Sequence, residues 1–264
     1  PTATLGDAHT LAELKAINNK LSGTLTLNDY TVALSGSSAD VAAALAGTFA
    51  DTYSGTATLN DNHTLAELVA INNGTTGNIT LNSNAVALTG STSDVKAALA
   101  GNVGGVYTGN ITLNDGNGTG IAATDITTIE SDTTGTITVS NNINLTGTSA
   151  EIAAAVADVN TFSGTPTATL GDAHTLAELV AINNALTGTL TLNDVTVALT
   201  GSAADIKAAL AGTFAVGYSG NVTITDANGT GIAAADINTI AGATSGTVTV
   251  TNNINITGNS DVIA

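Results

Sequence analysis

The sequence predicts an α/β repeat: a right-handed solenoid of about ten strand–helix half-coils, with a parallel sheet on one side and short helices on the other. Three observations support this fold class. Long stretches of the chain recur at a period of about 55 residues, which indicates stacked supersecondary units. Each full period carries paired helix-start signals. Each also carries short runs of alternating β-branched residues, which are typical of strands.

The repeats are nearly identical in places. The opening PTATLGDAHTLAEL returns from Pro166, and NITLNDGNGTGIAATDI from Asn110 returns as NVTITDANGTGIAAADI from Asn221. We expect residues 1–264 to form one continuous array, with approximate periods 1–55, 56–109, 110–165, 166–220 and 221–264. The chain starts at Pro1 and stops at Ala264 inside a predicted helix, so we expect a segment of a longer chain.

The first half of one period combines a strand, a turn and a helix start. Residues 56–59 alternate small and β-branched side chains, which favours a short strand, and residues 60–62 have turn chemistry. Thr64 followed by Glu67 forms a capping box. The helix should then end at Asn72-Asn73-Gly74, because asparagine and glycine tolerate a left-handed C-cap. Its apolar stripe consists of Leu65, Leu68 and Ile71.

The second half of the period contains two predicted strands and another helix. We expect the strands at 77–81 and 85–88. Ser91 and Asp94 resemble a second capping box, and Gly101 is placed to end that helix. Matching boxes recur elsewhere, at Thr10/Glu13, Thr175/Glu178, Ser37/Asp40, Thr148/Glu151 and Ser202/Asp205.

Two features leave alternatives open. The Asn28-Asp29 link is either a hairpin or a solenoid corner, and we favour the corner.

Stacking of all the half-coils at about 4.8 Å each would give a rod of roughly 50 Å. An array of β-sandwich modules fits less well, because such modules need about 100 residues and commonly bury large aromatic side chains. Aromatic residues make up only 3% of this chain.

Charge excludes several classes of partner. The 264 residues include 21 acidic and four basic ones, for a formal net charge of −17, and all four basic residues are lysines. Nucleic acid binding needs cationic contacts to phosphate, so we expect no nucleic acid partner. No apolar run approaches the roughly 20 residues of a membrane span, so we expect no direct membrane insertion. The absence of cysteine leaves the redox compartment undetermined.

The histidines and aromatic residues recur in register. His9, His63 and His174 each precede the capping threonine of the same helix type. A catalytic site needs different groups that converge at one place, so we expect no enzyme, with each imidazole bonded to a turn carbonyl or capping the helix start. Four aromatic residues each precede a Ser/Thr-Gly pair: Tyr53, Tyr107, Phe162 and Tyr218. They form either an exposed platform that stacks on sugars or a ladder of packed side chains along the array, and we favour the packed ladder.

Two glycine-rich loops resemble the start of an EF-hand calcium loop. The candidate calcium ligands are Asp115, Asn117, Thr119, Asp226, Asn228 and Thr230. The acid expected at the twelfth position is missing, because Ile126 and Ile237 stand there and Asp125 and Asp236 come one residue early. The alternative is a glycine-rich turn that lengthens a strand-to-helix link. We expect no other cofactor.

Threonines alternate along several predicted strands. An array of such strands is a candidate surface for carbohydrate or ice, and the alternative is ordinary β propensity with one hydroxyl face in solvent. The repeated pairs are Thr24/Thr26, Thr136/Thr138, Thr189/Thr191 and Thr247/Thr249.

Two phrases carry a family resemblance. Leu-Thr-Gly-Ser/Thr-x-x-Asp/Glu-Ile/Val-x-x-Ala-Leu, as in residues 199–210, resembles repeats in giant cell-surface proteins of cyanobacteria and other aquatic bacteria. Thr/Ser-Gly-Thr-Ile/Val-Thr-Val followed by Asn-Asn is similar to the same repeats. The resemblance covers essentially the whole chain. It implies a long adhesin, surface-layer-like or filament-forming polypeptide, often associated with calcium. The Gly-Gly-x-Gly-x-Asp nonapeptide of RTX repeats is absent.

These observations predict a non-enzymatic, extracellular structural segment at the cell surface that forms a stalk, filament or adhesin shaft. Its expected partners are neighbouring copies of itself or other surface polymers. The alternative is a repeat module that binds carbohydrate or ice through its threonine-rich strand faces. A polysaccharide lyase is disfavoured, because its site needs a cationic group or metal to stabilise a developing anion, and this chain has no arginine.

Overall fold

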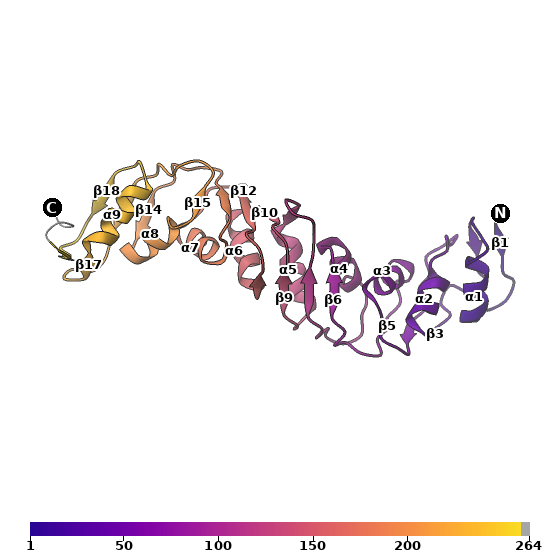
Figure 1. Ribbon diagram of the computed structural model, residues 1–264. Helices are drawn as coiled ribbons and strands as arrows, with labels where there is room; N and C mark the ends of the chain where they lie inside the picture. The colour runs from indigo at the N-terminus through magenta and orange to yellow at the C-terminus, as the bar shows by residue number, and fades with distance from the viewer. Residues whose placement is uncertain (260–264) are drawn as a thin grey trace. The chain divides into compact units, whose positions relative to one another are not determined.

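The structure is a computed structural model that describes residues 1–259. In that range the chain is α/β, with nine helices and short strands that pair in parallel (Figure 1). The predicted helix that includes Ala264 lies outside the described residues. The chain divides into two compact units, one made of residues 1–115 and 128–138 and the other of residues 116–127 and 139–264.

The first unit contains helices α1 to α4. Its helices are α1 (Leu11–Asn18), α2 (Ser38–Leu45), α3 (Leu65–Gly74) and α4 (Thr92–Leu99). Its strands are β1 (Ala3–Thr4), β2 (Leu25–Thr26), β3 (Leu34–Gly36), β4 (Ala57–Leu59), β5 (Ile79–Thr80), β6 (Leu88–Gly90) and β7 (Ile111–Leu113). Two elements include residues of both units: α5 (Ala123–Asp132) and β9 (Ile137–Val139).

The second unit contains helices α6 to α9. Its helices are α6 (Ser149–Asp158), α7 (Leu176–Ala185), α8 (Ala203–Ala209) and α9 (Ala234–Ala243). Its strands are β8 (Gly120–Ala122), β10 (Asn144–Gly147), β11 (Thr161–Phe162), β12 (Thr167–Leu170), β13 (Thr189–Thr191), β14 (Leu199–Gly201), β15 (Thr213–Phe214), β16 (Val222–Ile224), β17 (Gly231–Ala233), β18 (Val248–Val250) and β19 (Asn255–Thr257).

The strands form several separate parallel sheets, whereas the sequence predicted one sheet. In the first unit β1 pairs with β2, β3 and β5 flank β4, and β6 pairs with β7. In the second unit the sheets run β8-β10-β12-β13-β15, β14-β16-β18 and β17-β19. The two strands on either side of the turn after β2 illustrate this division into separate sheets. β2 lies in the sheet with β1, and β3 lies in the sheet with β4 and β5. The Asn28-Asp29 link is therefore a corner and not a hairpin.

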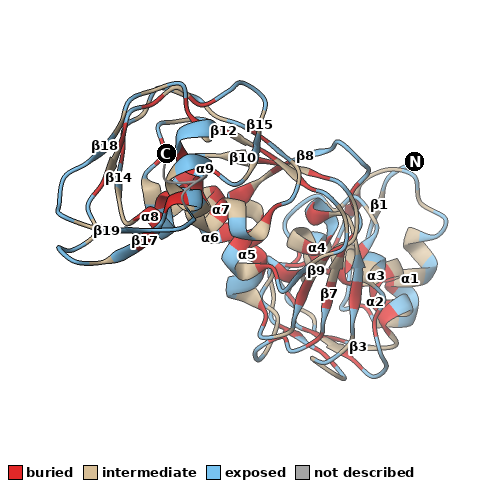
Figure 2. Cartoon of the chain, turned by 60° about the vertical axis from the view of Figure 1, so that its left-hand side comes forward, coloured by how far each residue is buried: buried red, intermediate tan, exposed pale blue. Residues whose placement is uncertain are grey.

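Parallel pairing aligns apolar residues of successive half-repeats. Leu145 pairs with Ala168, which pairs in turn with Leu190, and all three are at most 1% exposed. Consecutive helices also pack on one another, from α1 to α4 in one unit and from α6 to α9 in the other. Buried residues alternate with half-buried or exposed ones along most of the strands, as expected for strands with one face in a core (Figure 2). Full burial of one such leucine contributes about 1.5–3 kcal/mol.

The predicted helix starts are confirmed. Thr64 has an extended backbone, and its side chain accepts a hydrogen bond from the Glu67 amide at 3.3 Å. Glu67 accepts the Thr64 N–H in return at 2.8 Å, which completes the box. Side-chain caps also form at the other predicted starts: Thr10, Ser37, Ser91, Thr148, Thr175 and Ser202.

The predicted helix ends are confirmed, since α3 ends at Gly74 and Gly101 follows the C-cap Ala100 of α4, but the predicted left-handed backbone is wrong. Gly74 is the last residue of α3, and neither it nor Gly101 has a positive φ. Both glycines are instead required by close packing. A Cβ on Gly74 would collide with Leu45, and a Cβ on Gly101 would collide with the Asn72 amide. Small residues here let successive half-repeats approach closely.

One predicted strand is displaced along the chain. The sequence placed a strand at 85–88, and the structure places β6 at Leu88–Gly90. The pairing of Leu88 with Ile111 sets this position, because it buries both side chains. Ala85 ends the turn before the strand, and residues 86–87 connect that turn to the strand without regular structure.

Candidate functional site

The three histidines each contact a tyrosine that lies 44 residues further along the chain. His9 Nε2 is 3.1 Å from Tyr53 Oη, and the same distance joins His63 to Tyr107 and His174 to Tyr218. The histidines come from the turn before a capped helix, and all six side chains are buried. Each pair therefore connects two half-repeats of the same unit.

The hydrogen bonds of the tyrosine define the proton position on the histidine. Tyr107 Oη donates to the Val86 carbonyl at 2.5 Å, and Tyr53 and Tyr218 donate to Val32 and Val197 at 2.6 Å. Because each hydroxyl has one proton, its remaining role toward histidine is that of acceptor. The Nε2 atom must then carry the imidazole proton. The predicted contact of histidine with a turn carbonyl or helix start is wrong.

Burial keeps both members of each pair neutral. The pKa of His9, His63 and His174 is lowered chiefly by burial, which disfavours the charged imidazolium. Burial also raises the pKa of the tyrosines, to about 12 for Tyr107. In each histidine Nδ1 is buried without a hydrogen-bond partner. A general base needs access to a substrate proton. These side chains are buried, so their geometry suits a structural hydrogen bond between half-repeats better than proton transfer to a substrate.

The period 110–165 lacks both the histidine and the tyrosine hydroxyl. Residues 110–165 contain no histidine, and in the sequence Phe162 precedes the Ser-Gly pair as the tyrosines precede theirs. The backbone at Phe162 differs from that at the tyrosines, because Ser163 N–H donates to Val139 in strand β9, whereas Ser219 N–H donates to Val195 in the turn after β13. The histidine, which donates the hydrogen bond, and the tyrosine hydroxyl, which accepts it, are therefore both missing from the same period. The burial of the tyrosines also excludes them as an exposed platform for sugars.

Four aspartates connect each turn to the helix of the preceding half-repeat. Asp61 accepts the N–H of Ser38 at 2.7 Å, and Asp172 accepts that of Ser149 at 2.6 Å. Asp115 and Asp226, both candidate calcium ligands, do the same for Thr92 and Ala203 at 3.0 and 2.7 Å. The bonded residues are 23 positions apart in all four cases. A carboxylate at a helix N-terminus stabilises the helix dipole.

The remaining candidate calcium ligands form structural turns. Asn228 Oδ1 accepts the N–H of Asn253 at 2.9 Å, and Asn117 Oδ1 accepts that of Asn142 at 3.0 Å. The backbone N–H of Thr119 and Thr230 donates within its own loop, to Gly116 and Ala227, at 3.0 Å. The glycine-rich turn explains the motif without a metal, since Gly118 and Gly229 have φ of 77° and 78°.

The loops assemble few of the acidic ligands that calcium prefers. In the described part of the chain, no group of three or more His, Cys, Asp or Glu side chains is placed to hold a metal. Asp236, near the position where a bidentate acid was expected, forms an ion pair with Lys207. The Asp226 and Asn228 oxygens that calcium would use accept backbone N–H bonds. Calcium binding at these loops stays a prediction.

Sequence analysis did not identify the role of three equivalent helix asparagines, which connect each helix to the next one. The side-chain amides of Asn18, Asn72 and Asn183 donate to carbonyls of Ala44, Ala98 and Ala209 at the ends of the following helices. These amides satisfy carbonyls that the helix itself leaves unpaired. The repeated Ile-Asn-Asn phrase marks the positions, but the turn chemistry of asparagine obscured their role. A Lys15–Asp40 ion pair also connects α1 with α2.

Threonines form ladders across neighbouring strands. Thr200, Thr223 and Thr249 are consecutive partners in one sheet, and Thr146, Thr169 and Thr191 are partners in another. They lie on the face opposite to the buried residues of the same strands. Neighbouring strands are about 4.8 Å apart, so each ladder presents hydroxyl groups at that interval.

Two cavities occupy equivalent places one period apart in the first unit. One, of about 510 Å³, is lined by Phe49, Asp51 and Tyr53 among others. The second, of about 230 Å³, is lined by Val103, Tyr107 and Asp132, and burial raises the pKa of Asp132. Each places one carboxylate near a neutral tyrosine, which is less than the pair of acid and base groups that general acid–base catalysis uses.

No helix within residues 1–259 has the length and hydrophobicity of a membrane span. No family model matches the chain, and neither a curated protein nor a solved structure is significantly similar to it.

Proposed function

We propose that this chain is a non-enzymatic structural segment of an extracellular surface protein, and that its repeats form a stalk, filament or adhesin shaft. In this proposal the two units continue one right-handed α/β solenoid. The length of the array, and not a single pocket, provides the function. Other surface polymers or copies of the same chain are its partners.

The observation that supports the proposal is the recurrence of the same contacts between half-repeats. The histidine–tyrosine pair joins residues 44 positions apart in each of three copies, and the aspartate contact joins residues 23 positions apart in each of four. Polar groups that another protein would gather into one site are distributed here as connections between neighbours. Such nearest-neighbour contacts are the basis of stability in repeat proteins.

The surface charge agrees with this function. A net charge of −17 keeps a long polypeptide soluble and opposes its collapse onto other copies. The few basic groups also serve the repeat. Lys15 and Lys207 each form an ion pair with an aspartate of the following helix. These pairs are exposed, so each contributes at most about 1 kcal/mol.

Removal of one whole period tests the proposal. A variant that lacks residues 56–109 should still unfold cooperatively and keep its helix content by circular dichroism, because its neighbours rejoin in register. Its maximum dimension in small-angle X-ray scattering should fall by about 10 Å, the rise of two half-coils. The control lacks residues 56–95, which breaks the register and should abolish cooperative unfolding. If the in-register deletion unfolds as well, the repeats are not a modular shaft.

The threonine ladders favour a second candidate function. Regularly spaced hydroxyl groups on strand faces can bind carbohydrate or order water at an ice surface. Glycan-array binding and ice-crystal shaping test this candidate, with Thr223→Val as the variant. Valine keeps the shape and β propensity of threonine and removes the hydroxyl group at the centre of one ladder. Activity of the parent protein that the variant lacks would support a binding module.

A further inference from the structure

The tripeptide Asn-Gly-Thr occurs three times in the chain, at residues 73–75, 117–119 and 228–230. Asn-x-Thr is the acceptor sequence for N-glycosylation, which attaches a sugar to an asparagine amide on the surface of an exported protein. Such a short motif also arises from composition alone in a chain rich in asparagine and threonine. The fold places the three copies in different surroundings, and this difference distinguishes two of them from the third.

The copy at residues 73–75 is closed to a modifying enzyme. It spans the end of helix α3, and its threonine, Thr75, is only 7% exposed. The Thr75 hydroxyl donates to the Gly55 carbonyl at 2.8 Å and accepts the Gly77 N–H at 3.0 Å. Recognition of this threonine would therefore require its contact with the preceding half-repeat to open.

The copies at residues 117–119 and 228–230 lie in exposed turns. In each, the threonine N–H donates to the carbonyl three residues earlier at 3.0 Å, which closes a β-turn. All three residues of the first copy are exposed, as are the asparagine and glycine of the second, whose threonine is half-buried. Within residues 1–259 neither threonine hydroxyl makes a hydrogen bond, so both are available for recognition by an enzyme.

The asparagine of each turn is held through its oxygen atom. Asn117 Oδ1 accepts the N–H of Asn142 at 3.0 Å, and Asn228 Oδ1 accepts that of Asn253 at 2.9 Å. Since the partner is an N–H donor, the bonded atom must be the amide oxygen. The two Nδ2 atoms make no hydrogen bond in the described part of the chain. A sugar on Nδ2 therefore leaves the contact with the next half-repeat intact.

The other Asn-x-Thr triplets lie at paired strands or before a helix. They begin at Asn62, Asn78, Asn110, Asn144, Asn221 and Asn255. In all but the last, the central residue is at most 3% exposed, because it packs into the core. The last belongs to β19, which pairs with β17. An enzyme would have to displace part of the core or a strand to bind these triplets.

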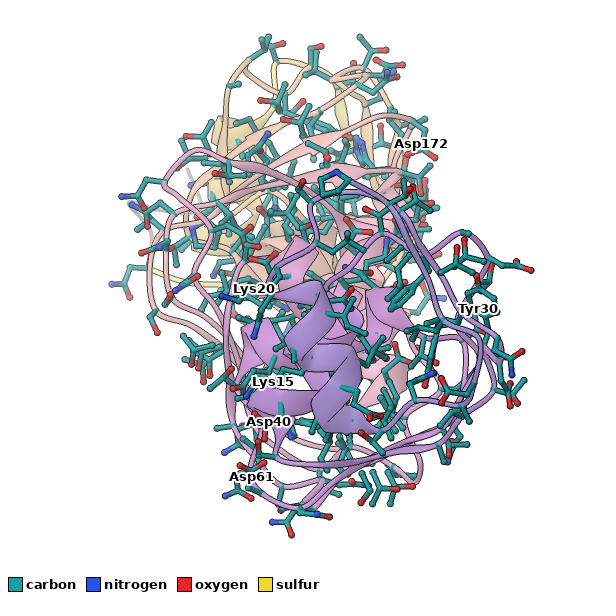
Figure 3. All side chains as sticks on the ribbon, turned by 90° about the vertical axis from the view of Figure 1, so that its right-hand side faces the viewer. Lys15, Lys20, Tyr30, Asp40, Asp61 and Asp172 are labelled. Carbon is teal, nitrogen blue, oxygen red and sulfur yellow. The ribbon has the colours of Figure 1, made fainter. Side chains whose placement is uncertain are left out.

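Other reactive groups on the surface are few. The chain has no cysteine, and its four basic residues are lysines. Lys15 and Lys207 form ion pairs with Asp40 and Asp236, and Figure 3 shows Lys15 and Asp40 close together beside α1. Asparagine amides and threonine hydroxyls are therefore the most numerous candidates for covalent modification.

We propose that Asn117 and Asn228 are N-glycosylation sites. The glycosyl donor is an oligosaccharide linked to a polyisoprenyl pyrophosphate, and an oligosaccharide transferase of the export pathway binds the turn. Asparagine Nδ2 attacks the anomeric carbon of the first sugar as the bond from that carbon to the pyrophosphate oxygen breaks. The pyrophosphate carrier leaves with the electron pair of that bond. Nδ2 gives one of its two protons to a base of the transferase, and a neutral N-glycosidic bond remains.

Peptide mapping of the protein isolated from its source cells tests this inference. Cleavage after acidic residues releases the two sites in separate peptides, 116–125 and 227–236, each with a single asparagine. Mass spectrometry should find both peptides with an added oligosaccharide and Asn73 unmodified. Absence of the glycan from both peptides would overturn the inference, as would modification of Asn73 to the same extent.

Transfer in vitro shows whether the fold selects the sites. A purified oligosaccharide transferase and its lipid-linked donor act on the folded 264-residue chain and on free peptides of residues 70–78, 114–122 and 225–233. All three peptides should accept the oligosaccharide, whereas the folded chain should accept it only in the two turns. A folded chain that stays unmodified while the peptides react would overturn the inference.

Single substitutions assign each glycan to its turn. Thr119→Ala should abolish transfer to Asn117 and leave transfer to Asn228 unchanged, and Thr230→Ala should do the reverse. Neither should change the circular dichroism spectrum, because the hydroxyls that they remove make no hydrogen bond in the described residues. The matched control is Thr80→Ala, which removes an exposed threonine from a strand triplet and should leave both glycans in place. Transfer to Asn117 that survives Thr119→Ala would contradict recognition of the triplet.

The inference rests on the proposed extracellular location, because the transferase meets only exported chains. The two failures are distinguishable by cell fractionation. An unmodified chain found outside the cell would reject glycosylation and leave the proposed shaft intact. A chain found only inside the cell would reject the extracellular location itself, whatever the folded chain accepts in vitro.

Discussion

At the residue scale, the histidine–tyrosine pair shows how a titratable group can be structural. His63 donates to Tyr107, which donates to the Val86 carbonyl, so one chain of hydrogen bonds joins three parts of the repeat. The glycine two positions after each tyrosine is required by the same contact. A Cβ on Gly109 would collide with the Val86 carbonyl. The chemistry of these residues is therefore used to hold neighbouring backbones together.

Removal of one hydroxyl group measures the strength of this connection. Tyr107→Phe should lower the free energy of unfolding by about 1–3 kcal/mol, because the His63 N–H and the Val86 carbonyl lose their partner in a buried place. Urea unfolding measures the change. In a double-mutant cycle with His63→Leu the two effects should be non-additive. Additive effects would show that the two side chains are not coupled. Tyr30→Phe, at a half-buried tyrosine, is the control and should cost less.

Acid should weaken the fold through the same histidines. Burial lowers the folded-state pKa of His9, His63 and His174 below the ordinary value of 6.5. The unfolded chain then binds more protons, so this stability is fully present above about pH 6.5 and is lost as the pH falls through the folded pKa. Protonation of Asp132, whose pKa is raised by burial, opposes the loss in part.

Urea unfolding at pH 7.5 and pH 5 checks this dependence. The parent should be less stable at pH 5, and a variant with all three histidines changed to glutamine should lose most of the difference. Carboxylates such as Glu13 and Asp40 have a lowered pKa, so their contribution is lost only below about pH 4.5. An equal pH dependence in both proteins would contradict the assignment to histidine.

At the element scale, each short helix depends on a neighbour as well as on its own cap. Helices of eight to ten residues are marginal in isolation. The start of α6 is held by its own capping box at Thr148 and by Asp172 from the following half-repeat. The same combination of local and non-local acceptors recurs at α2, α4 and α8. Stacking thus stabilises helices that would otherwise fray.

The chain contains its own control for this effect. Asp172→Ala should lower the free energy of unfolding by about 1 kcal/mol, since α6 loses an acceptor and a favourable charge at its N-terminus. Asp7→Ala, in the same sequence context but exposed, should change it by no more than about 0.5 kcal/mol. Denaturant unfolding of both variants measures the two changes in the free energy of unfolding. Equal effects would mean that the contact between half-repeats contributes nothing.

The glycine-rich loops allow a direct test of calcium. A ligand that binds only the folded state must raise its stability. If these loops bind calcium, millimolar calcium should raise the unfolding temperature above its value in EDTA; if they are only turns, in which Asp226 and Asn228 accept backbone N–H groups, it should not change. Magnesium controls for general attraction of cations to an acidic chain. A rise with calcium and not with magnesium, abolished by Asn228→Ala, would establish a calcium site.

At the scale of the whole molecule, charge opposes compactness. The chain has 21 acidic residues against four lysines, so most carboxylates cannot have a lysine partner. Screening reduces this repulsion, since the Debye length falls from about 30 Å at 0.01 M salt to about 10 Å at 0.1 M. Chloride salts should therefore stabilise the fold, although they weaken the exposed lysine–aspartate pairs.

Thermal unfolding at about 10 mM and about 150 mM sodium chloride tests this balance. The midpoint should rise with salt. In Lys207→Gln, which loses an ion pair with Asp236, the rise should be larger than in the parent. A midpoint that falls with salt would show that the favourable pairs outweigh the general repulsion.

The sequence by itself determined the periods, the alternation of strands and helices, and the helix starts. Capping boxes involve residues three apart, and strands show a period of two, so local spacing suffices for both. It placed the helix ends correctly at Gly74 and Gly101 but gave the wrong reason for glycine there, because tertiary packing and not a left-handed backbone requires it. The pairing of histidine with tyrosine also went unrecognised, although the period 110–165, which has Phe162 in place of tyrosine and no histidine, was a visible signal.

Only the tertiary structure decided which residues meet between half-repeats and how the strands divide among sheets. Asp226 reaches the start of α8 because 23 residues return the chain to the same place in the next half-repeat. That distance depends on how the coils superpose, and no local motif specifies it. The same carboxylate therefore matches a calcium loop in the sequence and holds a helix N-terminus in the fold.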